Sequence, residues 1–150
     1  MKKETKWSLE KPLYCKPEDE RYEKYFKQLK TRGFSDEETW GLNNVIAEFV
    51  LPRLKRFREL NNGYPNGFTA KTWYQTLDKM IFAFDSILRE DEYQTGCYPK
   101  DYDYNFTTDE NGVIIWKDKR KPNYTLYNKM RVKRAEGLKL FAEYFEDLWW

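Results

Sequence analysis

Residues 35–88 read SDEETWGLNNVIAEFVLPRLKRFRELNNGYPNGFTAKTWYQTLDKMIFAFDSIL, and this stretch decides the fold of the chain. Apolar side chains recur at steps of three and four in two segments, 36–60 and 70–90, as they do on one face of an α-helix. Turn-forming residues at 61–68, NNGYPNGF, separate the two segments. The pattern therefore predicts a helical hairpin with two antiparallel helices.

Each apolar stripe of this hairpin carries one charged residue. Arg53 precedes the turn and Asp78 follows it, at separations that place the two side chains opposite one another. Buried charges persist in proteins mainly when they are paired, so we predict a structural ion pair between Arg53 and Asp78. The alternative is that the planar guanidinium of Arg53 binds an anionic ligand.

A second carboxylate, Asp85, lies one heptad after Asp78 and is expected on the same helix face. Two carboxylates can begin a metal site or an acid–base pair, but the pattern places no third carboxylate beside them. A carboxylate-based, metal-dependent enzyme is therefore the alternative that we rank last. We assign no catalytic residue, no metal ligand and no cofactor from the sequence.

Local signals refine the ends of the two central helices. Ser35 followed by Glu38 forms a capping-box pattern at the start of the first helix, and Thr69 is a capping residue for the second. Pro52 falls inside the first helix, where its ring removes a backbone hydrogen bond. We expect a kink or a split there, near residues 48–51.

The remaining segments complete a single domain. Helical spacing predicts helices over about 18–31 and 124–148, and residues 1–16 are expected to form an N-terminal arm. Between the helices, 91–122 loses the helical period, and Asn111-Gly112 ahead of an apolar run predicts a small β-hairpin or loop insertion. The fold class that follows is a mainly α, antiparallel bundle of three to four helices.

Composition excludes several kinds of site. The 150 residues contain no histidine, which excludes Ser-His-Asp and Cys-His catalysis and histidine-liganded zinc. Cys15 and Cys97 are the only thiols and are far apart in sequence, so neither a zinc site nor a disulfide framework is expected. No apolar signal segment or membrane span is visible, and we expect a reducing cytoplasm without membrane attachment.

Charge is unevenly distributed. Residues 91–110 hold six acids and one base, whereas 113–134 hold eight bases and one acid. Basic side chains with interleaved rings can attract phosphate and stack on bases, although a solvated basic surface is the alternative that we favour. The candidate ligand-binding residues on this reasoning are Arg53, Arg56, Trp116, Lys119, Arg120, Tyr124, Tyr127 and Arg131.

Aromatic residues supply a second set of candidates. Tyr98, Tyr102 and Tyr104 lie in the acidic segment and form either a recognition surface or a loop packed over the bundle. Trp149 and Trp150 end the chain, where exposed rings would make an adhesive patch for a partner or a second copy. We therefore treat these five residues as interface candidates.

The segments FSDEETWGL (34–42), IAEFVLPRLKRF (46–57) and LDKMIFAF (77–84) resemble a group of small uncharacterised proteins encoded by tailed bacteriophages and prophages. The resemblance covers about residues 33–90. It implies a viral setting in the cytoplasm of a bacterial host and leaves the mechanism open.

Two binding functions precede the enzyme in our ranking. The first is a non-enzymatic accessory protein that binds and neutralises a host component, such as a defence factor or a nucleotide-derived signal. The second is a protein–protein interaction module that acts on a host enzyme or assembles with itself. Nucleic-acid binding is a less favoured form of the first, because the chain shows no recognised nucleic-acid module and its net charge is only +2.

Overall fold

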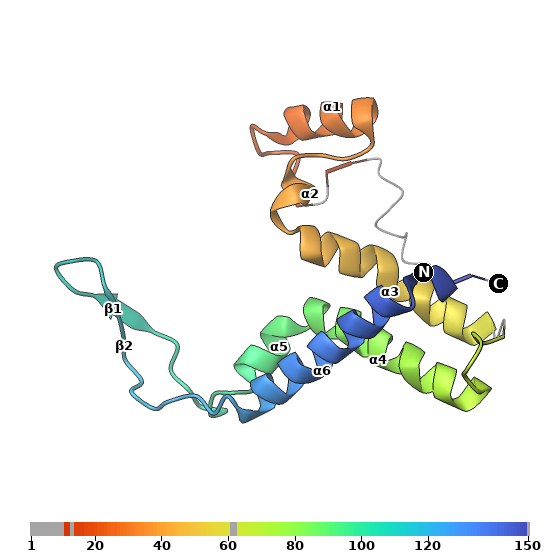
Figure 1. The fold of residues 1–150 in the computed structure, drawn as a ribbon. Coiled ribbons are helices and arrows are strands. Elements are labelled where there is room, and N and C mark those ends of the chain that lie inside the picture. The colour runs from red at the N-terminus through yellow and green to blue at the C-terminus, as the bar shows by residue number, and fades with distance from the viewer. Residues whose placement is uncertain (1–10, 13, 61–62, 150) are drawn as a thin grey trace.

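Two antiparallel helices, α3 (Leu42–Leu60) and α4 (Ala70–Leu88), form the predicted helical hairpin at the centre of the molecule (Figure 1). A third long helix, α6 (Thr125–Glu143), packs along α4. The computed structural model describes residues 11–12, 14–60 and 63–149. Within them the chain is a mainly helical single domain with a small β-hairpin insertion, as the sequence predicts; the predicted arm at 1–16 lies largely outside the described residues.

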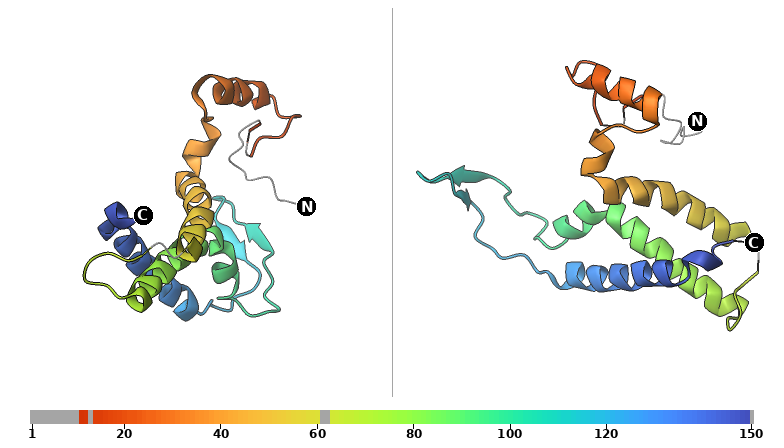
Figure 2. Two further views of the ribbon diagram at one scale, coloured as in Figure 1. Left: turned by 90° about the vertical axis from the view of Figure 1, so that its right-hand side faces the viewer. Right: turned by 45° about the horizontal axis from the view of Figure 1, so that its top comes forward.

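Shorter elements flank the three long helices. Figure 2 shows the first two helices beyond the N-terminal end of α3, and the two strands reaching away from the helices on a long arm. These elements are α1 (Tyr22–Arg32), α2 (Glu37–Trp40), α5 (Glu90–Thr95), β1 (Phe106–Thr108), β2 (Ile114–Trp116) and a 3₁₀ turn, η1 (Phe145–Asp147).

Helix α4 begins as its sequence predicts. The Thr69 side chain accepts a hydrogen bond from the backbone N–H of Thr72, and the Thr72 hydroxyl accepts one from the backbone N–H of Thr69. This reciprocal capping box satisfies two donors that the first turn of a helix leaves without an intrahelical partner. The cap therefore fixes the residue at which α4 begins.

The core lies where α3, α4 and α6 meet. Trp73 packs edge-to-face against Phe68 and Tyr144, and Phe84 packs in the same way against Phe141. Aromatic pairs in this geometry add about 0.5–1.5 kcal/mol each beyond the area that they bury. The fully connected buried cluster comprises Ala47, Leu51, Leu54, Trp73, Leu77, Met80 and Phe84.

Helices α4 and α6 cross at Gly137. A Cβ placed on Gly137 would lie 2.2 Å from the Lys79 carbonyl oxygen and 2.7 Å from the Ala83 Cβ. Only a residue without a side chain allows two helix backbones to approach this closely. Gly137 therefore sets the distance between α4 and α6, the two helices that are in the most extensive contact.

Several predicted boundaries are wrong. The helix predicted over 36–60 is split at Gly41 into α2 and α3, whereas α3 continues through Pro52. Glycine has a poor helix propensity, and its backbone here leaves the helical region (φ −112°, ψ 42°). Burial of Leu51 and Leu54 on either side of Pro52 offsets the single backbone bond that the proline lacks.

The two outer helices are shorter than predicted. The helix predicted over 18–31 begins at Tyr22, because the Asp19 carboxylate accepts hydrogen bonds from the backbone and side chain of Arg21 and holds a turn ahead of it. The helix predicted over 124–148 ends at Glu143, and the chain continues into η1.

The predicted Arg53–Asp78 ion pair is also wrong. Asp78 pairs with Arg58: the guanidinium Nη2 donates to Oδ2 over 3.0 Å, and Nε lies 2.6 Å from Oδ1. Arg53 instead donates to the Phe49 carbonyl oxygen over 2.9 Å, and its guanidinium lies 3.8 Å from the centre of the Phe49 ring. Arg53 is exposed and does not belong to the packed face of α3.

The reason for this error is that α3 has two apolar stripes with the same spacing. Ala47, Leu51 and Leu54 face α4, and Arg58 continues their stripe toward Asp78. The residues Leu42, Ile46, Phe49 and Arg53 repeat the same steps of four, three and four on an exposed face. Periodicity alone cannot say which of two such stripes meets the partner helix.

No helix among the described residues combines the length and apolar character needed to cross a membrane.

Candidate interaction surface

The candidate functional site is the β-hairpin and the two chain segments that carry it. Strands β1 and β2 pair antiparallel, with Phe106 opposite Trp116, Thr107 opposite Ile115 and Thr108 opposite Ile114. Residues 97–105 lead out from α5, residues 117–124 lead back to α6, and the strands project beyond the helices (Figure 1). Directly opposed residues share one face of a hairpin, so Phe106, Trp116 and Ile114 lie on one face and Ile115 on the other.

The hairpin is apolar and exposed on both faces. Every residue of β1 and β2 is exposed. The two aromatic rings of the strands, Phe106 and Trp116, pack edge-to-face with their centroids 5.5 Å apart. Trp116 nevertheless keeps 44% of its surface exposed, and Val113 keeps 58%. A two-stranded hairpin whose residues are all exposed is marginally stable in water, so local interactions must hold this one.

The turn of the hairpin is one such interaction. The Asp109 carboxylate Oδ1 accepts hydrogen bonds of 2.8 Å from the backbone N–H groups of both Asn111 and Val113. Gly112 adopts a left-handed conformation (φ 78°) that favours glycine, and its N–H donates to the Asp109 carbonyl oxygen. These bonds close the turn without help from the helical body.

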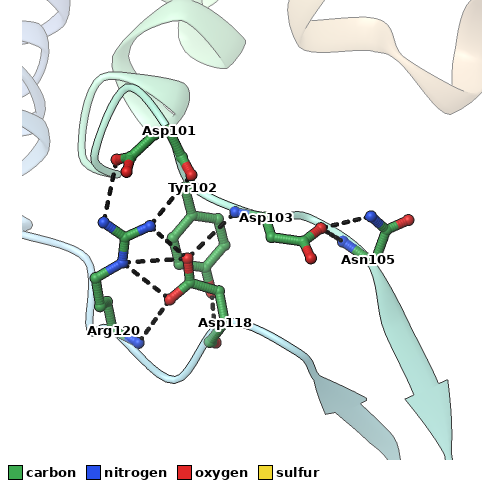
Figure 3. Close-up of polar contacts among 6 residues, drawn as sticks. All are labelled: Asp101, Tyr102, Asp103, Asn105, Asp118 and Arg120. Atoms are coloured by element: carbon green, nitrogen blue, oxygen red, sulfur yellow. Dashed lines mark hydrogen bonds and ion pairs between the residues drawn. The ribbon is translucent and has the colours of Figure 1, made fainter.

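An arginine clasp joins the two segments at the base of the hairpin (Figure 3). The Arg120 guanidinium contacts both carboxylate oxygens of Asp118, with Nη2 2.6 Å from Oδ2, and Nη1 donates to the Asp101 carboxylate over 3.1 Å. Nη2 also donates to the Asp101 carbonyl oxygen. Because a guanidinium is planar and its donors are fixed, contacts in several directions fix the outgoing segment against the returning one.

Asp118 is the centre of this clasp. Its side chain is only 9% exposed, and its carboxylate also accepts the backbone N–H of Asp103 over 3.2 Å. The adjacent Arg120 side chain holds the pKa of the Asp118 carboxyl far below its ordinary value, and the same contact raises the pKa of Arg120. The Tyr102 hydroxyl donates to the Asp118 carbonyl oxygen, which ties the ring to the same point.

The three interface tyrosines are brought together, but as a packed cluster at the base of the arm. Ring centroids lie 4.5 Å apart for Tyr98 and Tyr102 and 4.9 Å apart for Tyr102 and Tyr104. A hydrogen bond with Tyr124 and partial burial raise the pKa of the Tyr98 hydroxyl. Tyr98 and Tyr102 are half-buried, and of the three only Tyr104 is exposed. The three tyrosines therefore pack mainly against one another at the base of the hairpin and offer little exposed surface to a partner.

The candidate ligand-binding residues do not converge on one site. Arg53 and Arg56 lie on α3, and the Arg56 guanidinium pairs with Glu59. On α6, the Arg131 guanidinium lies 6.0 Å from the centre of the Tyr127 ring. The others, Trp116, Lys119, Arg120 and Tyr124, belong to the hairpin and its returning segment.

Other candidates are separated from the hairpin. Trp149 is 72% exposed near the C-terminus, which lies at the opposite end of the molecule from the hairpin (Figure 1), and Trp150 lies outside the described residues. Asp78 and Asp85 are a heptad apart, which places them about 10 Å apart along α4. Asp78 is paired with Arg58, and Asp85 is paired with Arg89 over 3.1 Å.

The structure identifies residues that sequence reasoning missed. Phe106, Ile114 and Ile115 are large apolar residues of the hairpin that stay exposed. For Ile114 and Ile115 the signal in the sequence is the apolar run at 113–116, inside a segment that is otherwise polar and long for a connection between two helices. That run predicts a strand, but only the coordinates show that nothing among the described residues covers it.

Comparisons of the chain with protein-family models, with curated proteins and with solved structures found no match. Among the described residues no group of three or more cysteines and carboxylates is placed to hold a metal ion.

Proposed function

We propose that this protein is a non-catalytic binding protein that inserts its β-hairpin into an apolar groove of a partner protein. The observation that carries the proposal is the exposure of Phe106, Val113, Ile114, Ile115 and Trp116 on an arm that projects from the bundle. Monomeric proteins seldom present contiguous apolar surface without a use for it, and such surface marks interaction sites.

The residue types of the hairpin suit a binding centre. Trp116 and Phe106 are large rings with few rotatable bonds, and aromatic residues are enriched at the centres of protein interfaces. The Asp109 turn and the Arg120 clasp hold the hairpin in one conformation before any partner arrives. Less conformational entropy is then lost on binding, which strengthens affinity without adding contacts.

The charges around the hairpin specify the rim of the groove. Lys117, Lys119 and Lys121 are exposed on the returning segment, and no ion pair formed within the described part of the chain involves them. Arg120, by contrast, is already paired with two carboxylates. A groove with acidic residues at its edge would complement the lysines and speed association at low salt.

The choice of a host protein as the partner follows from the phage setting that the sequence of residues 33–90 predicts. We propose that hairpin insertion neutralises a component of the infected cell. We do not favour a nucleotide-derived ligand, because the candidate ligand-binding residues lie on three separate parts of the molecule and form no common site. Assembly with a second copy is an alternative that the experiment below distinguishes.

Site-directed photo-crosslinking tests the proposal. A benzophenone amino acid at Ile115, on the hairpin face opposite Phe106 and Trp116, should form an adduct with one host protein, whereas the same group at Val132, exposed on α6, should not. The identified protein is then purified and titrated in vitro. Adducts only between two copies of the chain would replace the proposal with self-assembly, and equal crosslinking from both positions would refute it.

A further inference from the structure

An aromatic pocket of about 410 Å³ lies at the end of the bundle opposite the hairpin. Four structural segments contribute to it: the end of α3, residues 63–66 of the α3–α4 connection, the first turn of α4, and residues 147–149. The described residues that line it are Phe57, Gly63, Tyr64, Pro65, Asn66, Trp73, Asp147 and Trp149. Four of these eight residues are aromatic and one carries a carboxylate.

The rings of the aromatic pocket differ in how firmly they are held. Trp73 is 2% exposed and is fixed by edge-to-face contacts with Phe68 and Tyr144, so it forms a rigid part of the wall. Tyr64 and Trp149 are more than half exposed and stand at the opening. The pocket therefore combines a rigid aromatic wall with rings that a ligand can reach from solvent.

The described lining residues give the aromatic pocket a negative charge, although the whole chain carries a net charge of +2. Asp147 is the one charged side chain among them, and they include no lysine or arginine. The ion pairs formed between described residues do not involve the Asp147 carboxylate. A cationic ligand can therefore meet this carboxylate without displacing a basic side chain of the described part of the chain.

From this arrangement we infer that the aromatic pocket binds an alkylammonium group, held over the ring faces and neutralised by Asp147. The face of an aromatic ring is electron-rich and attracts an organic cation, and several rings around one ammonium group form the usual recognition site for methylated amines. An anionic ligand is disfavoured by Asp147, and a plain hydrocarbon would leave the carboxylate without a counter-charge. The ammonium group can belong to a free amine or to a lysine side chain of a polypeptide.

Titrations followed by NMR separate these possibilities. The probes are choline, its uncharged isostere 3,3-dimethylbutan-1-ol, and a short peptide that contains trimethyl-lysine. The indole N–H signals of Trp73 and Trp149 should shift saturably with choline or with the peptide, and the uncharged alcohol should bind at least about tenfold more weakly. Tighter binding of the peptide would indicate a polypeptide source, and tighter binding of choline a free amine.

Matched variants test the assignment of residues. Asp147→Asn and Trp149→Ala should each weaken choline binding by about 2- to 30-fold, the range expected for one cation–π or charge contact. Glu146→Gln removes the same charge from the neighbouring position, which does not line the pocket, and should leave binding unchanged. Equal affinities for choline and the alcohol, or equal losses in Asp147→Asn and Glu146→Gln, would overturn the inference, as would the absence of any saturable shift.

Discussion

Substitution of Gly137 by alanine should destabilise the protein, although alanine is the better helix former. In an isolated helix the change would stabilise by about 1 kcal/mol. Here the new Cβ would lie 2.2 Å from the Lys79 carbonyl oxygen, and both groups belong to helix backbones that no rotamer change can move. Helix α6 must shift away from α4 by more than 1 Å to restore ordinary contact distances, and overpacking of this kind costs about 1–3 kcal/mol or more.

Because the added Cβ meets backbone atoms, we take the upper part of this range, about 2–3 kcal/mol, and subtract the gain in helix propensity of about 1 kcal/mol. We therefore expect Gly137→Ala to lower the free energy of unfolding by about 1–2 kcal/mol. Urea denaturation followed by far-UV circular dichroism measures this directly. Gly41→Ala is the matched control: the nearest atom to its added Cβ is the Asn44 Nδ2 at 3.9 Å, so its effect should stay within about 0.5 kcal/mol. If Gly137→Ala were as stable as the parent protein, the close crossing of α4 and α6 would be refuted.

Four further substitutions each test one side chain. Arg53→Ala should change the free energy of unfolding by less than about 0.5 kcal/mol. Arg58→Ala should lower it by at most about 1 kcal/mol, because the Arg58–Asp78 ion pair is partly exposed. Chemical denaturation measures both changes, and a loss of several kcal/mol in either variant would indicate a buried ion pair instead. Tyr127→Phe should cost about 1 kcal/mol near neutral pH, because the Tyr127 hydroxyl donates to the Glu90 carboxylate over 2.7 Å. The same hydrogen bond lowers the pKa of Glu90. Its stabilisation is therefore fully present at pH values above the ordinary carboxyl pKa and is lost as the pH falls through the lowered pKa of Glu90. If Tyr127→Phe were equally destabilising at acidic pH, the hydrogen bond to the Glu90 carboxylate would be contradicted. Arg120→Ala should leave helicity unchanged and speed proteolytic cleavage of the arm, whereas equal cleavage rates would mean that the clasp does not order it.

The helical hairpin was predictable because several local signals agree. The capping box at Thr69, the turn residues at 61–68 and the apolar period of α4 each indicate the same arrangement. The partner of Asp78 was not predictable, because α3 carries two apolar stripes of equal spacing and only packing selects one. The position of the helix break was missed for a related reason. Proline has the lower helix propensity, but the buried residues Leu51 and Leu54 beside Pro52 hold α3 together, and the helix breaks at Gly41 instead.

The candidate site was less predictable than the fold. The alternation and the Asn-Gly pair indicate a hairpin, yet strand signals usually mean burial, and the exposure of Trp116 and Ile114 is a tertiary property. The Arg120 clasp was missed because Asp101 lies 19 residues away and meets Arg120 only when the returning segment lies against the outgoing one; the contact with Asp118, two residues away, is local. The charge segregation between the outgoing and returning segments was the one signal that could have suggested such a contact.

The affinity of the purified partner for Trp116→Ser, compared with Trp40→Ser, tests the central claim most directly. Both changes remove an exposed tryptophan, but Trp116 lies on the hairpin, whereas Trp40 lies on α2 and belongs to neither the hairpin nor the aromatic pocket. The proposed insertion predicts that Trp116→Ser weakens binding by about 30-fold or more, as expected for a residue at the centre of an interface, while Trp40→Ser binds like the parent protein. Unchanged affinity in Trp116→Ser, or equal losses in both variants, would contradict the hairpin as the binding element.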